Sequence, residues 1–429
     1  MTRTLLLAAM LLSALPAAAQ PPRTLLGPAT ADALFDDSVL HDITLNVSTQ
    51  DWQTLKDRYL ENTYYPADFR WGSNIVRNVG IKSRGSGSRS GTKPGLKVDF
   101  ARYTSDQTFL GLKSLVLRNN TQDPSGLRER LSMLIFRRMG LPASREAHAR
   151  LFINGEYSGL YTIVEPLDKA FLKRTWGDDS GWLYSYEYPT DAPPFYFEDR
   201  GDDPALYVPV PFTPETQGSN PRGDLLAAWI QAITRSGDAA WRTVMAQYLD
   251  LSRFLRHVAI EAYLGDDDGV LGNWGMNNFY TYRFPDTTTF AILPWDKSDA
   301  FISGPYASVW HNITDVPPAQ QNRLVNRALA YDDLQRVWLD ALDACVSTSL
   351  EPDLDLPAEG GWLAREVERE YAQVRAAALA DPVAPYSDEQ FEQAVEDLRT
   401  FARERPAFVA AEVAASRAAL GLVAPQPSR

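Results

Sequence analysis

The sequence predicts an α+β protein with two lobes, a strand-rich first half and a helix-rich second half. Up to about residue 165, short segments alternate between apolar and polar residues, and one helical segment at 123–139 interrupts them. From about residue 225, apolar residues recur mainly with the period of a helix, around a short hairpin at 278–293 that has polar clusters on both sides. This order predicts a cleft between the lobes.

The first elements are predicted from alternation and capping residues. Residues 41–47, 74–82 and 96–100 alternate as strands do. Residues 48–59 read as a helix, because Ser48 is a good N-cap and Asp51 would fall in the first turn.

The inserted helix and the hairpin after it have local sequence signals. Asp123 and Pro124 resemble an N-cap followed by Pro at the first helical position, and Gly140 would end the helix. Asn154-Gly155 is a dipeptide typical of hairpin turns. The strands predicted on either side of it are 149–153 and 157–164.

The second half is predicted to be mostly helical. Residues 166–224 are rich in Pro, Asp, Gly and Tyr and read as irregular. The predicted elements after them are helices at 225–249 and 251–263, strands at 278–283 and 288–293, and helices that start near Asp332, Gly361 and Ser387.

The N-terminal residues predict export. An apolar run from Leu5 to Leu15 is followed by Ala17, Ala18 and Ala19, which form an A-x-A-like cleavage site. We therefore expect a signal peptide at 1–19, a mature chain that begins near Gln20, and a leader at 20–38. No later segment has about 18 uninterrupted apolar residues, so no transmembrane segment is expected.

Composition excludes several classes of function. The net charge of −13 argues against nucleic-acid binding, which needs a basic surface. Cys345 is the single cysteine, so no intrachain disulfide can form, and its apolar neighbours predict a buried thiol. A zinc site is not expected, because the four histidines lie far apart in the sequence: His41, His148, His257 and His311.

Carboxylates and amides gather around the hairpin of the second half. Asp266, Asp267 and Asp268 begin a loop that ends in Asn277-Asn278, and Asp296 follows the second strand. Typical protein kinases use this order: a catalytic Asp, a metal-binding Asn, a hairpin and a metal-binding Asp. From spacing alone, a solvated turn or a calcium loop is an alternative. An EF-hand is not, because the twelfth position lacks Glu.

From about residue 42 to 406, the sequence resembles the spore-coat-protein-H (CotH) family of atypical protein kinases. No single motif is decisive, but their order over most of the chain is specific. The motifs are ENTYYPA at 61–67, VGIKSRG at 79–85, KPGLKVDF at 93–100, LRE at 127–129, NGEYSGLY at 154–161 with Val164-Glu165, NFY at 278–280 and PWD at 294–296.

The resemblance implies a divergent protein-kinase-like bilobal fold, with an N-lobe at 39–165 and a C-lobe at 166–425. Arg84 would begin the loop that covers the phosphates. Lys93 or Lys97 would hold the α- and β-phosphates and pair with Glu129 of the inserted helix. Glu165 would lie at the hinge that meets adenine.

The resemblance also implies roles in the second half. Asp268 would be the catalytic carboxylate, while Asn278 and Asp296 would bind the metal. Asn273 has the usual kinase spacing from Asp268 and Asn277 is adjacent, so the choice of amide stays open. No Asp-Phe-Gly is present, and Asp296-Lys297-Ser298 stands in its place.

The expected function is that of an exported atypical protein kinase. It would use ATP with Mg²⁺ or Mn²⁺ and transfer the γ-phosphoryl group to Ser or Thr hydroxyls of envelope or secreted proteins. One alternative is a non-catalytic surface, adhesion or assembly protein on the same scaffold. Another is a phosphoryl or nucleotidyl transferase with a non-protein acceptor.

Overall fold

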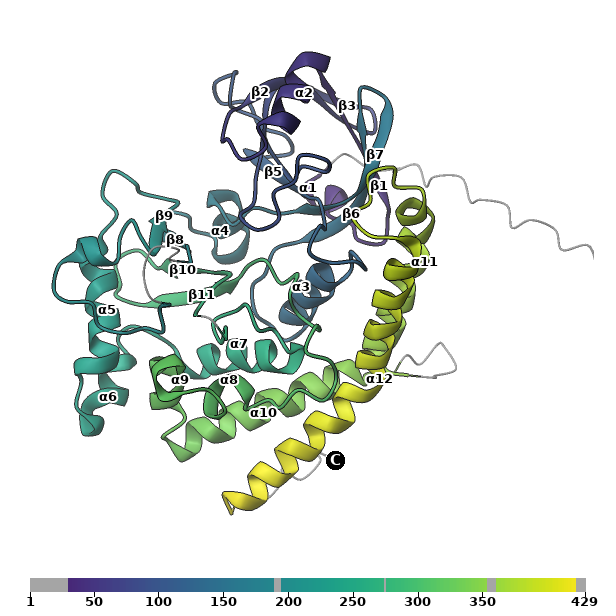
Figure 1. Ribbon diagram of the computed structural model, residues 1–429. Helices are drawn as coiled ribbons and strands as arrows, with labels where there is room; N and C mark the ends of the chain where they lie inside the picture. Colours follow the sequence, from purple (N-terminus) through teal and green to yellow (C-terminus); the bar gives the residue numbers. More distant parts are fainter. Residues whose placement is uncertain (1–29, 189–193, 274, 353–359, 422–429) are drawn as a thin grey trace, which may run out of the picture.

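The computed structural model describes residues 30–188, 194–273, 275–352 and 360–421 (Figure 1). It has a mixed α+β architecture with a strand-rich first half and a helix-rich second half, which confirms this part of the prediction. The expected signal peptide at 1–19 lies outside the described residues, as do 20–29 of the leader. Ala31–Leu34 forms the short helix α1.

The first seven strands close into a barrel in the order β1-β2-β3-β4-β5-β7-β6, in which β1 and β6 pair in parallel and the other neighbours are antiparallel. Closure removes unpaired strand edges. The strands are β1 His41–Val47, β2 Tyr65–Trp71, β3 Asn74–Ser83, β4 Leu96–Asp99, β5 Ser114–Arg118, β6 Glu146–Ile153 and β7 Glu156–Val164.

Alternation predicted β1 well, since Ile43, Leu45 and Val47 all point into the barrel core while Asp42 and Asn46 are exposed. Two strands of the barrel were not predicted from the sequence. β2 carries a bulge between Ala67 and Phe69, which interrupts its pairing register. β5 is buried along its whole length, so it shows no alternation.

Helix α2, Thr49–Asp57, begins as predicted, because the Ser48 hydroxyl accepts a hydrogen bond from the Asp51 N–H. The predicted start of the inserted helix is wrong, because α3 spans Arg128–Arg138. Gly126 has a φ of +66°, a left-handed conformation that a helix cannot run through. Asp123 instead accepts hydrogen bonds from the Ser125 and Arg128 N–H groups and so fixes the turn before α3.

The expectation that 166–224 is irregular is wrong in part. It contains helix α4, Lys169–Trp176, and strands β8, Trp182–Tyr186, and β9, Phe212–Pro214. These strands join the hairpin of β10, Phe279–Arg283, and β11, Phe290–Pro294, in a second sheet ordered β11-β10-β8-β9. β8 pairs with β10, which lies about a hundred residues later, so local sequence signals do not show the pairing.

The remaining described elements are helical. The predicted helix at 225–249 is divided at Ser236-Gly237, whereas the helix starts near 332, 361 and 387 are confirmed. The helices are α5 Gly223–Arg235, α6 Asp238–Met245, α7 Leu251–Leu264, α8 His311–Thr314, α9 Arg323–Ala328, α10 Asp332–Ser349, α11 Trp362–Leu379 and α12 Asp388–Ala419, with 3₁₀ turns at Pro204–Leu206 and Pro318–Gln320.

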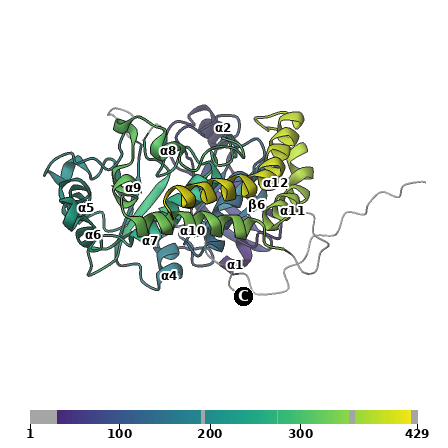
Figure 2. The same cartoon turned by 90° about the horizontal axis from the view of Figure 1, so that it is seen from below.

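Helix α3 belongs to the core of the helical region although it interrupts the barrel strands. Its buried residues Leu131, Met133 and Phe136 pack in one apolar cluster with α7, α10 and α12, separate from the barrel core. On its other side, the buried Arg130 forms ion pairs with Glu366 and Glu370 of α11. α11 thus rises beside the barrel (Figure 1), and α12 packs along α10 (Figure 2).

Other sequence expectations concern the cysteine and membrane spans. Cys345 is fully buried in α10, as predicted. None of the helices in the described ranges combines the length and the apolar character needed to cross a bilayer.

Candidate active site

The hairpin of β10 and β11 carries two of the expected site residues at its open end. Asn278 precedes β10 and Asp296 follows β11, and the Trp295 N–H donates to the Asn278 carbonyl over 3.1 Å. Asn278 has a φ of +52° and Asp296 a φ of +49°. Asn and Asp are among the non-glycine residues that adopt this left-handed region most readily.

Asp268 faces the same end of the hairpin and is held by two amides. The side-chain Nδ2 of Asn277 donates to Oδ1 of Asp268 over 2.9 Å, and Nδ2 of Asn278 donates to Oδ2 over 2.7 Å. Burial raises the pKa of Asp268, and the negative charge of Asp296 acts in the same direction. The structure therefore brings Asp268, Asn278 and Asp296 together, whereas the contacts of Asn273 come from its main chain.

The two carboxylates before Asp268 have other partners. Asp266 is buried, and it shares the Lys297 ammonium with Glu261 of α7, each over 2.7 Å. Asp267 accepts hydrogen bonds from Ser303 and Asn312. These contacts fix the loop and leave Asp268 as the half-buried carboxylate that faces Asp296.

Arg118, at the end of β5, is the cation that meets Glu129. It forms an ion pair with Glu129 of α3 and another, over 2.5 Å, with Asp296. Burial acts to raise the pKa of Asp296, but the guanidinium groups of Arg118 and Arg84 outweigh it and hold the pKa below its usual value. Arg118 was not among the predicted site residues.

The order of elements explains this error. The elements before Glu129 come in the order found in protein kinases: a strand, a phosphate loop, a strand, a strand with a basic residue, and a helix with a Glu. Here they are β3, the Gly/Ser loop, β4, β5 with its terminal Arg118, and α3 with Glu129. Lys97 lies one strand too early for that place. β5 is buried along its whole length, so it lacks the alternation that would have marked Arg118 as the end of a strand.

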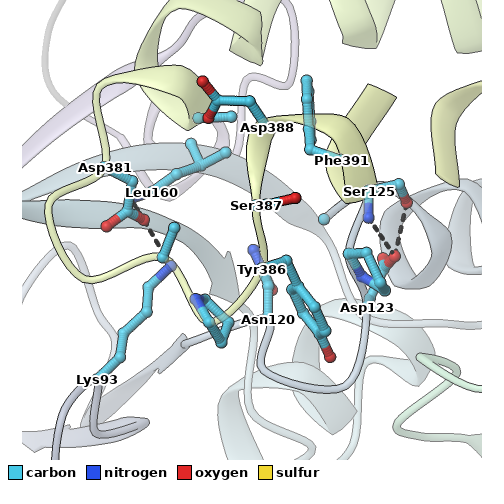
Figure 3. A pocket seen from close by; sticks show the side chains of 15 residues that line it. Lys93, Asn120, Asp123, Ser125, Leu160, Asp381, Tyr386, Ser387, Asp388 and Phe391 are labelled. Carbon is cyan, nitrogen blue, oxygen red and sulfur yellow. Dashed lines mark hydrogen bonds and ion pairs between the residues drawn. The ribbon is translucent and has the colours of Figure 1, made fainter. Parts of the chain in front are cut away.

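The expected pairing of Lys93 with Glu129 is therefore wrong. The Lys93 ammonium lies 2.7 Å from a carboxylate oxygen of Asp381, in the connection between α11 and α12, and both side chains are buried (Figure 3). The Leu160 N–H of β7 donates to the same carboxylate over 2.9 Å. Gly159 is required beside it, because a Cβ there would lie 2.6 Å from an Asp381 oxygen.

This pair lines a small cavity of about 40 Å³ between the barrel and the C-terminal helices (Figure 3). Asp123 and Tyr386 also line it, and the Tyr386 hydroxyl donates to the Thr121 carbonyl. The space suits a few water molecules and not a nucleotide.

The structure also shows the surroundings of Lys97 and Glu165. Lys97 lies opposite Lys82 in the β3–β4 register and close enough to Asp168 to act on its carboxylate. Glu165 follows β7 at the link from the barrel to α4. Its buried carboxylate forms ion pairs with Arg145 and Arg174, each over 2.7 Å.

Two further acidic residues surround the site and were missed. Glu146 of β6 is buried beside Glu129, and burial raises its pKa to about 7 while Arg118 acts in the opposite direction. Asp299 is half-buried; burial and the charges of Asp268 and Asp296 raise its pKa to about 6. No sequence motif singled out Glu146, since its role depends on which strands meet at the base of the barrel.

Two oxygen donors at the open end of the hairpin are of the kind that a magnesium ion binds. Among the described residues, no three His, Cys, Asp or Glu side chains form a ready-made metal site. Mg²⁺ commonly binds one or two carboxylates and takes its other ligands from phosphates and water. The oxygens of Asp296 and Asn278, at one end of the hairpin, are suitable donors of this kind.

Comparison with known proteins gives the family. The sequence model of the family described as CotH kinase protein matches residues 81–409. The inner spore coat protein H of Bacillus subtilis is 23% identical over 59% of this chain and 66% of its own length. The invasin CotH3 of Rhizopus delemar is 26% identical over 54% of this chain and 39% of its own length.

The matched region is thus less than two thirds of the length of each of these relatives. Among solved structures, the Helicobacter pylori proinflammatory kinase CtkA aligns with 78% of this chain and 94% of its own, at 10% identity and a TM-score of 0.30. A score this low does not carry an argument about the fold. The family match covers most of the chain, and the protein belongs to the CotH kinase protein family.

Proposed function

We propose that this protein is an atypical protein kinase that transfers the γ-phosphoryl group of ATP to Ser or Thr hydroxyls of exported proteins, with Mg²⁺ or Mn²⁺. The observation that carries the proposal is Arg118, held between Glu129 and Asp296 at the end of the hairpin where Asn277 and Asn278 hold Asp268. Membership of the CotH kinase protein family supports it.

In this proposal, the acceptor oxygen bonds to the γ-phosphorus as the bond from that phosphorus to the β-phosphate oxygen breaks, and ADP leaves. Asp268 orients the hydroxyl and takes its proton. Arg118 exchanges its contact with Asp296 for a contact with the phosphates, while its ion pair with Glu129 is kept. Asp296 and Asn278 would hold the metal, which would supply positive charge for the phosphate oxygens.

Other roles stay proposals as well. Arg84 lies near Arg118 and Asp296 and at the start of the Gly/Ser loop, so it is suited to contact phosphate. The barrel and α3 would form the N-lobe and the region from 166 on the C-lobe. Lys97 and Glu165 lie toward the link between them, where the nucleotide base would bind.

Export is part of the proposal. Its support is the predicted cleavage site at 17–19 and the names of relatives, an inner spore coat protein and an invasin. The same names support a second candidate, a non-catalytic surface or assembly protein. The pairing of the buried Arg118 with both Glu129 and the partly exposed Asp296 favours the enzyme, since a scaffold needs no cation at such a site.

Two substitutions test the assignment. Asp296→Ala should abolish transfer from γ-labelled ATP to dephosphorylated casein and weaken Mg-ATP binding, because this carboxylate would hold the cation that accompanies ATP. Asp268→Asn should lower transfer about 1,000-fold and leave the Kd of Mg-ATP within about threefold, because its contact is with the acceptor. Calorimetry with Mg-ATP separates the two roles.

Mg-ATP binding and transfer at the parent level in both variants would remove these residues from the mechanism. A parent protein that binds no Mg-ATP under these conditions would favour the non-catalytic candidate.

A further inference from the structure

Helix α12 lies along the segment that follows Asp296 in the chain. Contacts recur along residues 301–310, the part of the segment that runs beside the helix. The Phe301 and Phe401 ring centroids lie 4.8 Å apart, the Tyr306 hydroxyl bonds to Glu404, the Val309 N–H donates to Glu412 over 2.9 Å, and the Trp310 indole N–H donates to Ser416 over 3.1 Å. Figure 2 shows α12 extended beside α10. One long helix thus supports this segment at successive turns.

Arg405, in the middle of these contacts, also reaches a second segment. It is fully buried, and within the described ranges its guanidinium donates to four main-chain carbonyls. Two acceptors, Ala262 at 2.7 Å and Tyr263 at 2.8 Å, lie in the last turn of α7. The other two are Pro305, at 3.1 Å, and Ala307.

The two segments that Arg405 joins flank the proposed active-site residues in the sequence. The last turn of α7 leads directly into the loop of Asp268, and residues 299–307 follow Asp296. The Phe301 N–H donates to the Leu264 carbonyl over 2.8 Å, which closes the same junction. Orphan carbonyls at a helix C-terminus attract a cation, and a buried guanidinium there is well suited to satisfy them.

The surroundings of the Arg405 guanidinium are aromatic rings and main-chain carbonyls. The aromatic rings of Tyr263, Phe401 and Phe408 surround its guanidinium, and the described contacts include no carboxylate partner. Burying a cation among them is costly, and the carbonyls that it satisfies offset this cost, so an apolar side chain here would leave buried acceptors unpaired. What the guanidinium adds is a fixed geometry between two stretches of backbone.

We propose that Arg405 is a positioning residue for phosphoryl transfer, which fixes the segment after Asp296 against the end of α7. The acceptor protein then meets a rigid surface, and its hydroxyl is aligned with Asp268. This inference rests on the proposed kinase function. It predicts that loss of Arg405 impairs transfer to protein but not nucleotide binding.

The test uses Arg405→Met beside Arg417→Met in the full chain. Arg417 is a matched control, because it is also a buried arginine of α12, but it pairs with Asp340 and Asp343 of α10, far along the helix from the site. Arg405→Met should lower kcat/KM for dephosphorylated casein about 100-fold with the Kd of Mg-ATP within about threefold. Added guanidinium ion should restore part of the rate, and Arg417→Met should keep the parent rate.

Amide hydrogen exchange gives a readout that does not depend on catalysis. Arg405→Met should speed exchange of the Phe301 amide about 100-fold relative to Arg417→Met. Equal exchange and equal transfer in the two variants would overturn the positioning role. If the parent transferred no phosphate, the proposed kinase function would fail, and the exchange at Phe301 would still decide whether Arg405 holds the junction.

Discussion

Two buried cations of the barrel, Arg118 and Lys93, have different surroundings. Arg118 is shared by Glu129 and Asp296, which come from different elements, and Asp296 is still 21% exposed. Among the described residues, Lys93 has Asp381 as its carboxylate partner, and both side chains of that pair are buried. A cation with several partners at an accessible site can exchange one of them for phosphate. A cation enclosed with one partner serves to join two parts of the chain.

The largest expected effect separates the two cations by activity. Arg118→Met should lower kcat/KM for phosphoryl transfer about 1,000-fold and weaken Mg-ATP binding, because it removes the cation that Glu129 holds against the phosphates. Lys93→Met, assayed at a temperature where it is folded, should leave the Kd of Mg-ATP within about threefold. The opposite pattern would show that Lys93, and not Arg118, contacts the nucleotide.

The next effect concerns stability. Lys93→Met leaves Asp381 buried without its cation, and Asp381→Leu leaves Lys93 buried without its carboxylate. Each substitution should therefore lower the free energy of unfolding by about 3 kcal/mol. The double variant should lose less than the sum, because it removes both charges. Urea unfolding followed by circular dichroism checks this. Additive losses would show that the pair does not act as a unit.

The smallest effect is a pH dependence in the Arg118 cluster. Burial raises the pKa of Glu146 to about 7, and burial also raises the pKa of its neighbour Glu129. A carboxyl with a raised pKa binds its proton more tightly in the folded state, so the free energy of unfolding should fall as the pH rises from about 4.5 to about 7. The fall should be on the order of 1–2 kcal/mol and be reduced in Glu146→Gln.

Urea unfolding at several pH values between about 5 and 8 measures this slope. Asp381→Asn serves as the comparison, since it changes the Lys93 pair and leaves the Glu129–Glu146 pair intact. If the slope were the same in the parent and in Glu146→Gln, Glu146 would not be the source of the pH dependence.

Much of the local structure followed from the sequence. Ser48 and Ser387 cap their helices through hydrogen bonds within the same turn, and the Asn154-Gly155 hairpin closes over two residues. Signals of this kind act between near neighbours, so they can be seen without knowledge of the fold. The order of Asp268, Asn278 and Asp296 around a hairpin was visible for the same reason.

Long-range contacts could not be read in the same way. The parallel pairing of β1 with β6 closes the barrel, and β8 joins β10 across about a hundred residues. Arg118 and Lys93 are both basic residues in or beside barrel strands, and no local signal says which one meets Glu129.

The sequence by itself therefore determined the α+β class with its strand-rich and helix-rich halves, several helix starts, and the order of carboxylate and amide residues around the hairpin, because each depends on periodicity, capping or spacing within a short stretch. The tertiary structure decided which cation serves those carboxylates. Lys93 is taken by Asp381, 288 residues later, and Arg118 is left between Glu129 and Asp296. A buried charge must find a partner in space, and its partner can come from any part of the chain.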